Sequence, residues 1–263
     1  MNITFLYHSS FLVELSGCTL LFDWYGGPVP DYDRSKPLYV FASHHHGDHY
    51  APEIFAQLGM DNVWYVLANC IRLSAKRKAA LGIDDSHVFR LAAGRHLSLG
   101  GLDIQTYRST DAGVAFLVEV EGKTIFHAGD LHWWHWAEED AAWNQAMERD
   151  FKKECAKLQG KPVDVGFFVL DPRQEGEFWW GFDWWMRTME VKQAFPMHSW
   201  EDYTLVQTLR TLPCSAPYRD RVLEVSGKGQ VFSWAPTLAA DPILLYHLFT
   251  RRNFSMPGQE NLC

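Results

Sequence analysis

The chain has 263 residues, of which 47% are hydrophobic and 21% are charged, and this composition indicates a globular protein and excludes a disordered one. Its formal net charge of −8 disfavours a broad surface for nucleic acid or anionic membrane, although a local cationic pocket remains compatible with it. The five cysteines are scattered, without a Cys-x-x-Cys pair, and favour a reducing compartment. No signal-like start or membrane-length apolar run is present, so we expect a cytoplasmic protein with no membrane partner.

Strand and helix patterns alternate in the first half of the chain. Runs of β-branched and aromatic residues, separated by turn residues, predict strands over 3–7, 11–15, 18–22, 38–42, 63–67 and 88–91. A helix is expected to start at Ala51-Pro52-Glu53, because Pro is favoured in a first helical turn, and a second helix is predicted over 69–80. This alternation is typical of an α/β layer.

The second half begins with hairpins and returns to alternation. Strands are predicted over 96–99, 102–107, 114–120, 123–127, 163–170, 191–197 and 222–225, and helices over 137–158, 178–189 and 202–212. In the first of these helices Trp143, Met147, Phe151 and Cys155 recur every four residues, which we interpret as a stripe that faces the core. Because no repeat or linker interrupts the pattern, we predict one domain over residues 1–263.

A cluster of metal-ligand side chains follows the predicted strand 38–42. Residues 43–49 read Ser-His-His-His-Gly-Asp-His, so His44, His46, Asp48 and His49 form the spacing His-x-His-x-Asp-His. Side chains two apart in an extended segment share a face, so His44 and His46 can converge on one ion. Gly47 lets the backbone turn, so that Asp48 and His49 can serve a second ion. Imidazole and carboxylate together suit zinc, iron or manganese, and this fixed spacing argues against a merely solvated loop.

This motif resembles the signature of the metallo-β-lactamase superfamily. The resemblance implies an α/β four-layer αββα sandwich, in which two mixed β-sheets are flanked by helices, and a two-metal hydrolase site. Asp130, after the strand 123–127, and His198, in Pro196-Met197-His198-Ser199-Trp200, match later positions of the pattern. The implied ligands are His44 and His46 for the first ion, Asp48, His49 and His198 for the second, and Asp130 as a bridge between them.

The resemblance also implies the chemistry. Two divalent ions, zinc most readily and manganese or iron as alternatives, would activate a bridging hydroxide that attacks an ester, lactone or phosphodiester of a small molecule. Asp48 could in addition orient the nucleophile, which makes it a catalytic candidate. The opening hairpin, with His8 near its turn, is similar to the ascorbate-6-phosphate lactonase branch. His8 either faces the site or is a structural histidine at a strand end.

The chain departs from the family pattern at one ligand. The third histidine of the first ion is expected from residues 107–113, which contain no histidine. Asp111 is the best substitute, and a turn Asp that hydrogen-bonds its own backbone is an equally compatible interpretation. His132 or His135 could compensate if their loop folds back. A set of histidines and carboxylates favours manganese or iron, or leaves the first site weak.

Tryptophans gather on both sides of the predicted site residues. Residues 133–136 follow Asp130 directly, and residues 179–185 precede the strand that carries His198, so we expect aromatic walls around a ligand pocket. We predict that His135 is a catalytic residue that contacts substrate or a metal-bound water. His127 lies inside a strand and is expected to be packed in the core.

The favoured function is therefore a metal-dependent hydrolase whose partner is a small-molecule substrate, and a homo-oligomer is compatible with the sequence. A nucleic-acid phosphodiesterase is an alternative, disfavoured by the acidic balance and by the lack of room for an inserted binding domain. A metal-poor, non-catalytic relative that binds a ligand is another alternative, because the third histidine is missing.

Overall fold

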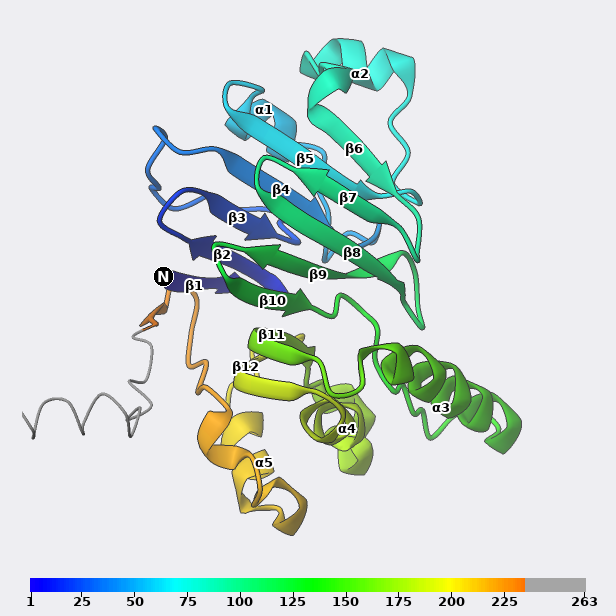
Figure 1. Cartoon of the computed structure of the whole chain (residues 1–263). Helices are drawn as coiled ribbons and strands as arrows, with labels where there is room; N and C mark the ends of the chain where they lie inside the picture. Colours follow the sequence, from blue (N-terminus) through cyan, green and yellow to red (C-terminus); the bar gives the residue numbers. More distant parts are fainter. Residues whose placement is uncertain (235–263) are drawn as a thin grey trace, which may run out of the picture. The chain divides into compact units, whose positions relative to one another are not determined.

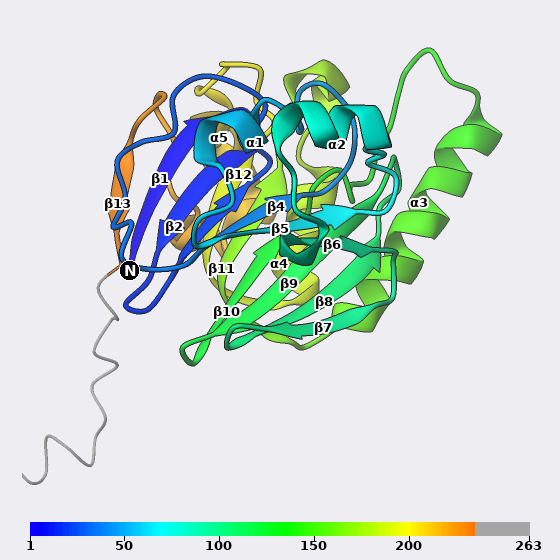
Figure 2. The same cartoon turned by 90° about the horizontal axis from the view of Figure 1, so that it is seen from above.

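The strand-forming runs assemble into two mixed sheets in the computed structural model, which describes residues 1–234 (Figures 1 and 2). The first sheet has the order β13 (Val231–Ser233), β1 (Asn2–Tyr7), β2 (Ser10–Glu14), β3 (Thr19–Phe22), β4 (Leu38–Ala42), β5 (Val63–Ala68), β6 (Val88–Leu91). The second has the order β12 (Glu190–Met197), β11 (Pro162–Val169), β10 (Lys123–His127), β9 (Val114–Val120), β8 (Leu102–Arg108), β7 (His96–Leu99).

Helices lie on the outer faces of these sheets. The α-helices are α1 (Ile54–Leu58), α2 (Ala75–Leu81), α3 (Ala141–Cys155), α4 (Trp180–Thr188) and α5 (Leu205–Thr211). Short 3₁₀ segments are η1 (Asp85–His87), η2 (Ala156–Leu158), η3 (Pro172–Glu177), η4 (Pro213–Ser215) and η5 (Arg219–Arg221). Figure 2 shows α1 and α2 over the first sheet and α4 on the side of the second.

The two-residue period of the strands explains the layers. In β2, β3 and β4, the residues Leu12, Leu21 and Val40 belong to an apolar cluster that includes α1. Their neighbours Phe11, Phe22 and Phe41 point the other way, because successive side chains of a strand alternate between faces. The Phe11 ring lies 4.2 Å from Phe167 of the second sheet, and Phe41 lies 5.2 Å from Phe116.

The outer face of the second sheet is covered in the same manner. Trp185 of α4 is fully buried and packs 5.2 Å from Phe126 in β10 and 5.7 Å from Phe168 in β11. Phe151 of α3 packs 5.4 Å from the same indole. Both faces of both sheets are therefore covered, and the predicted α/β four-layer sandwich is confirmed.

Several predicted boundaries are wrong for local reasons. The predicted helix 69–80 begins only at Ala75, because Asn69 donates its N–H to Leu91 and Ser74 caps the helix. The predicted helix 137–158 begins at Ala141, where the side chain of Asp140 accepts from the N–H of Trp143. The predicted strand 222–225 is only a single bridge from Val222 to Ala194.

The strand that completes the first sheet lies later, at Val231–Ser233, and pairs with β1. It was missed because three residues carry too little periodicity to predict a strand. Contacts group Met1–Ser233 as one unit. Residues 235–263, including Cys263, lie outside the described residues, so the single domain over 1–263 stays a prediction. Within residues 1–234, no helix has the length and apolarity needed to cross a bilayer.

The inter-sheet core yields a first prediction. Phe167→Ala removes the ring that contacts Phe11 at 4.2 Å and Phe195 at 5.5 Å, and it should lower the free energy of unfolding by about 3–5 kcal/mol. Phe89→Ala is the control, because Phe89 lies half-buried in the edge strand β6. This substitution should lower the free energy of unfolding by less than half as much. Urea denaturation followed by circular dichroism measures both, and equal losses would contradict the proposed core.

Candidate metal centre

The fold brings the carboxyl ends of five strands to the same side of the sandwich. Strands β1, β3 and β4 run parallel to one another in the first sheet, and β10 and β12 do so in the second. Carboxyl ends of parallel strands lie at the same edge, and each of these five strands is followed by a polar segment. The side chains that these segments bring together are His8, Asp23, His44, His46, Asp48, His49, Asp130 and His198.

The potential ligands form two adjoining groups, each with its ligand atoms within 4.8 Å of one another. The first group is His44, His46, Asp111 and Asp130, and the second is His8, Asp48, His49 and His198. In the first group, Asp130 Oδ2 lies 3.6 Å from His44 Nε2. The other oxygen of Asp130 lies 3.1 Å from His49 Nε2 and 3.6 Å from His198 Nε2, so this carboxylate spans both groups.

Buried polar atoms without partners show that the groups suit cations. The atoms His8 Nε2, His44 Nε2, His49 Nε2, His198 Nε2 and Asp130 Oδ1 are buried and make no hydrogen bond within the described residues. Such atoms carry a large desolvation cost unless something else binds them. Four imidazole nitrogens and a carboxylate oxygen aimed at one space form the donor set of a site for zinc, manganese or iron.

The ionisation states agree with this interpretation. Burial and the neighbouring His49 lower the pKa of His44 to about 4, so its ring is neutral and can donate a lone pair. Burial opposes ionisation of Asp130, yet His49 and His198 hold the pKa of its carboxyl well below the ordinary value. Burial and the charge of Asp130 raise the pKa of Asp111. This shift is expected from the repulsion between two carboxylates that face one space.

A fully buried carboxylate, Asp23, orients two of the histidines. Its Oδ1 accepts the backbone N–H of Ser43 at 2.7 Å, and its Oδ2 accepts the Ser43 hydroxyl at 2.6 Å. The same oxygen lies 2.7 Å from His49 Nδ1. Because the Ser43 hydroxyl donates its one hydrogen to Asp23, it accepts a hydrogen bond from His44 Nδ1 at 2.9 Å. Both rings are thus oriented with Nε2 facing the site, and at His49 a metal ion would replace the proton that Asp130 and Asp23 favour by raising the pKa of this ring.

Asp171 has the corresponding role at His198. It follows β11, is fully buried, and its Oδ2 lies 2.8 Å from His198 Nδ1. The sequence prediction missed both Asp23 and Asp171 as site residues. The available signal was that each is an aspartate within two residues of the end of a buried strand, β3 for Asp23 and β11 for Asp171.

Strained backbone gathers at the same edge. His8, Asp23 and His198 have φ of 49°, 44° and 66°, in the left-handed region that residues other than glycine rarely adopt. The N–H of His198 donates to the carbonyl of His8 at 3.0 Å, which ties the two sheets together beside the site. Such strain persists where the surroundings over-determine it, typically at functional sites.

The structure places Asp111 in the first group, opposite His46. Its Oδ2 lies 3.2 Å from His46 Nδ1 and 4.0 Å from His44 Nε2. The loop is held by Thr110, whose hydroxyl donates to the carbonyl of His132 at 2.6 Å. Gly113 is required here, since φ is 69° and a Cβ would lie 2.0 Å from the Ser43 carbonyl oxygen. Asp111 therefore lies with His44, His46 and Asp130 in the first group, and its role as a substitute ligand stays a prediction.

His8 belongs to the second group, which decides between its two interpretations. It is buried, and its Nε2 lies 3.4 Å from Asp48 Oδ2. Two other histidines near the site are turned away from it. The Nε2 atom of His127 hydrogen-bonds the Ser9 carbonyl, and that of His132 hydrogen-bonds Gln174 Oε1. His127 also stacks on Phe22 in the core, as expected from its position inside a strand.

A cavity of about 300 Å³ opens onto both groups. Its lining residues are His46, Asp48, Thr110, Asp111, Asp130, Trp134, Trp136, Trp143, Met147, Arg173 and His198. Trp143 and Met147 were predicted to face the core and instead line this cavity, while Phe151 and Cys155 of the same stripe are buried. The apolar stripe runs along α3 from the cavity into the core. A helical period in the sequence does not distinguish the residues that line a cavity from those that pack in the core.

His135, which the sequence predicts to be catalytic, does not line the cavity of the metal centre. His135 packs against Trp180 at 5.0 Å and lines a separate depression with Trp133 and Trp180, outside the cavity of the metal centre. The group 179–185 also fails as an opposite wall, because Trp185 is buried in the core and Trp184 lies over Lys152. Alternation along the loop explains this outcome, since Trp134 and Trp136 face the cavity while Trp133 and His135 face away.

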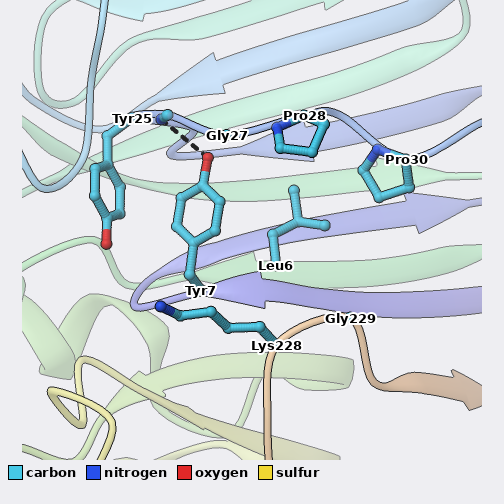
Figure 3. A pocket seen from close by; sticks show the side chains of 9 residues that line it. Leu6, Tyr7, Tyr25, Gly27, Pro28, Pro30, Lys228 and Gly229 are labelled. Carbon is cyan, nitrogen blue, oxygen red and sulfur yellow. Dashed lines mark hydrogen bonds between the residues drawn. The ribbon is translucent and has the colours of Figure 1, made fainter.

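A larger apolar cavity of about 600 Å³ lies at the end of β1 and is shown in Figure 3. Its walls include Leu6, Tyr7, Tyr25 and Pro28, and Gly26 donates its N–H to the Tyr7 hydroxyl at 2.9 Å. It contains none of the ligand side chains, although the Tyr25 ring lies 6.1 Å from His8. We therefore place the reaction at the smaller cavity, where the ionisable groups converge.

Comparisons with known proteins agree with this geometry. A family model described as a beta-lactamase superfamily domain matches residues 2–144. A UPF0173 metal-dependent hydrolase of Desulforamulus reducens is 33% identical over 141 residues, which cover 49% of this chain and 62% of that protein. One from Carboxydothermus hydrogenoformans is 34% identical over 142 residues, with the same coverage. The match thus spans less than two thirds of these relatives.

Solved structures share the fold at low sequence identity. A putative metal-dependent hydrolase from Parabacteroides distasonis has a TM-score of 0.56 at 16% identity, over 85% of this chain and 92% of that one. Igni18, a metallo hydrolase from Ignicoccus hospitalis, has a TM-score of 0.56 at 14% identity, over 89% and 99%. Since the family model covers more than half of the residues, this chain belongs to the metallo-β-lactamase superfamily.

Proposed function

We propose that this protein is a metal-dependent hydrolase of a small molecule that carries an ester, lactone or phosphodiester bond. The observation that carries the proposal is the convergence of two groups of ligand side chains on one cavity, with four buried imidazole nitrogens that lack a partner within the described residues. The names of the relatives and the shared fold support a metal-dependent hydrolase.

The two groups would each hold one divalent ion. His44, His46, Asp111 and Asp130 would hold the first, and His8, Asp48, His49 and His198 the second, with Asp130 reaching both. Ions bound there supply Lewis acidity and lower the pKa of a water toward neutrality. Zinc is favoured by the number of imidazoles, and the carboxylates keep manganese and iron as alternatives.

The protein's own residues fix the geometry of this chemistry. Asp23 and Asp171 hold the protons of His49 and His198 on Nδ1 and keep each Nε2 free. Asp48 reaches the cavity, and His8 and His49 outweigh its burial and keep the pKa of its carboxyl below the ordinary value. We propose that Asp48 accepts a hydrogen bond from the attacking water and orients it. Trp134, Trp136 and Trp143 limit the access of bulk water.

The alternatives are less well supported. A nucleic-acid phosphodiesterase would need a basic channel, whereas the net charge is −8 and Arg173 is the one Lys or Arg that lines the described cavity. The missing third histidine favours a non-catalytic relative, but Asp111 lies 3.2 Å from His46 and supports a complete ligand set. We also propose a cytoplasmic location, since Cys18, Cys70, Cys155 and Cys214 are free thiols.

The most informative single experiment combines metal analysis with a substrate panel. The purified protein is stripped of metal and reconstituted with zinc, manganese or iron, and each form is assayed on lactones, carboxylic esters and phosphodiesters. Two equivalents of tightly bound metal and metal-dependent turnover of at least one substrate class are expected. Protein that binds no divalent metal would contradict the proposal.

Two ligand substitutions test the assignment directly. His46→Ala and Asp130→Ala should each lower kcat/KM more than about 100-fold, since even partners outside the ligand set contribute about 10–100-fold. Both side chains lie on loops at the sheet edge, so the fold should be largely kept, as checked by circular dichroism. His96→Ala is the matched control, because His96 is also exposed and pairs with Asp103 at 2.6 Å, away from the cavity. Wild-type turnover in either ligand variant would refute the assignment.

Asp111 is tested by metal content. Asp111→Ala should reduce the metal retained after dialysis from about two ions per chain to about one, because the first group loses a carboxylate that faces His46 at 3.2 Å. Asp111→His, which introduces the residue type of the family pattern, should retain both ions. Asp103→Ala serves as the control in an exposed strand pair. Full metal content in Asp111→Ala, measured by mass spectrometry of the elements, would show that Asp111 is not a ligand.

Asp23 is tested by metal affinity. Asp23→Asn keeps the size but cannot accept the three hydrogen bonds from Ser43 and His49, so affinity should fall about 10- to 100-fold. Competition with a chromophoric chelator measures this constant. Asp164→Asn is the control, since Asp164 is buried and paired with Lys192 on β12 but lies outside both ligand groups. Equal losses in the two variants would reduce the role of Asp23 to general stability.

A further inference from the structure

One residue of the metal-centre cavity has no part in the chemistry described so far. Arg173 is the one cationic side chain among the described residues that line the cavity. It lies in η3, directly after β11, and its side chain is 48% exposed at the mouth.

The guanidinium is held in a fixed orientation. Its Nε donates to Asp171 Oδ1 at 3.0 Å, and its Nη2 donates to Asp171 Oδ2 at 2.6 Å. Its Cζ lies 4.7 Å from the ring centre of Trp200 and 5.5 Å from that of Trp136, both within the range of cation–π contacts. A planar cation fixed by a two-point carboxylate pair and two indoles loses little entropy when it binds a further group.

The ion pair with Asp171 does not use up the cation. A guanidinium carries five N–H groups, and Asp171 is its one hydrogen-bond partner in residues 1–234, so the Nη1 group still has donors to offer. The negative charge of Asp171 is moreover shared with His198 Nδ1 at 2.8 Å and Trp200 Nε1 at 3.3 Å. Arg173 therefore retains both positive charge and directed donors at the cavity mouth.

The rest of the lining indicates what those donors bind. Outside the ligand groups, the other lining residues are Thr110 and four aromatic or apolar residues, Trp134, Trp136, Trp143 and Met147, whereas the carboxylates of Asp48, Asp111 and Asp130 would face the ions. A volume of about 300 Å³ admits only a small molecule. A guanidinium fork matches the geometry of a carboxylate or a phosphate.

We propose that Arg173 binds an anionic oxygen group of the substrate, a carboxylate or a phosphate, so that the substrate is a small anionic ester, lactone or phosphodiester. Arg173 is thus a specificity-determining residue. The nature of the hydrolysed bond rests on the proposed function, whereas the binding of the anion does not.

Binding of product-like diacids tests the inference without turnover. Metal-loaded protein is titrated by calorimetry with succinate, succinamate and 3-phosphonopropionate, which share one carboxylate for the ions and differ at the other end. Wild type should bind succinate or 3-phosphonopropionate about 10- to 100-fold more tightly than succinamate, the range of one charge-assisted hydrogen bond. The tighter of the two dianions distinguishes carboxylate from phosphate recognition.

Variants assign this preference to the residue. Arg173→Gln keeps a donor for Asp171 and should bring the ratio of dianion to succinamate affinity close to one, with metal content unchanged. Arg187→Gln is the matched control, because Arg187 is also 48% exposed and paired with an aspartate, Asp183, but lies outside the cavity. It should keep the wild-type ratio. If Arg173→Gln loses metal, Arg173→Lys is the decisive variant, because it keeps the positive charge and lacks the paired donors of a guanidinium. Its ratio of dianion to succinamate affinity should fall below that of wild type.

No preference for the dianions in wild type, or an unchanged ratio in the decisive Arg173 variant, would overturn the inference. Where hydrolysis is found, the kinetic counterpart is a rise in KM for an anionic ester and less than threefold change for its neutral amide analogue in Arg173→Gln. A protein that binds dianions through Arg173 and hydrolyses nothing would refute the proposed function and leave the anion site standing.

Discussion

The buried carboxylate of Asp23 is the constraint on which the metal centre depends. It is fully buried, so its charge is stable only because Ser43 and His49 supply hydrogen bonds to both oxygens. Those bonds fix the start of the His-rich loop against the end of β3, and through the Ser43 hydroxyl they also fix the ring of His44. A carboxylate in this place orients ligands in both groups at once, which explains why a residue with φ of 44° is kept there.

Close approach of the two sheets supplies the second constraint. Gly129 precedes Asp130 with φ of 51°, and a Cβ there would lie 2.7 Å from the Ser43 Cβ. The hydrogen bond from His198 N to the carbonyl of His8 joins the edges of the two sheets beside this contact. Each ligand group therefore draws on both sheets, as Asp130 and His198 come from the second and the loop after β4 from the first. The site exists only in the folded sandwich, and metal binding should be coupled to folding.

The parts of this site that a sequence can predict are those carried by local spacing. His44, His46, Asp48 and His49 lie within six residues, so their convergence follows from the chain itself, and Asp130 and His198 followed from a family pattern. Asp23 and Asp171 escaped because they act on histidines 26 and 27 residues away, a relation set by strand pairing and not by spacing. The orientation of His135 could not be predicted, because side chains along an extended loop alternate between two faces. Only the packing of His135 against Trp180 decides which face meets the cavity. No sequence pattern pointed to Arg173. Its proposed role follows only from the folded structure, in which Asp171, Trp136 and Trp200 surround its side chain.

The two ligand groups differ in their access to water. In the first, the side chains of His46 and Asp111 are 44% and 40% exposed while His44 and Asp130 are buried, whereas in the second only Asp48, at 31%, is more than 5% exposed. Water competes with exposed ligands, and surrounding protein protects buried ones, so we infer that the second group would hold an ion more firmly than the first. Arg173 lines the same cavity as members of both groups, His46 and Asp111 of the first and Asp48 and His198 of the second. In the reaction that we propose, the more buried group would thus serve as the fixed anchor, and Arg173 would define where a small anionic substrate meets the reactive centre.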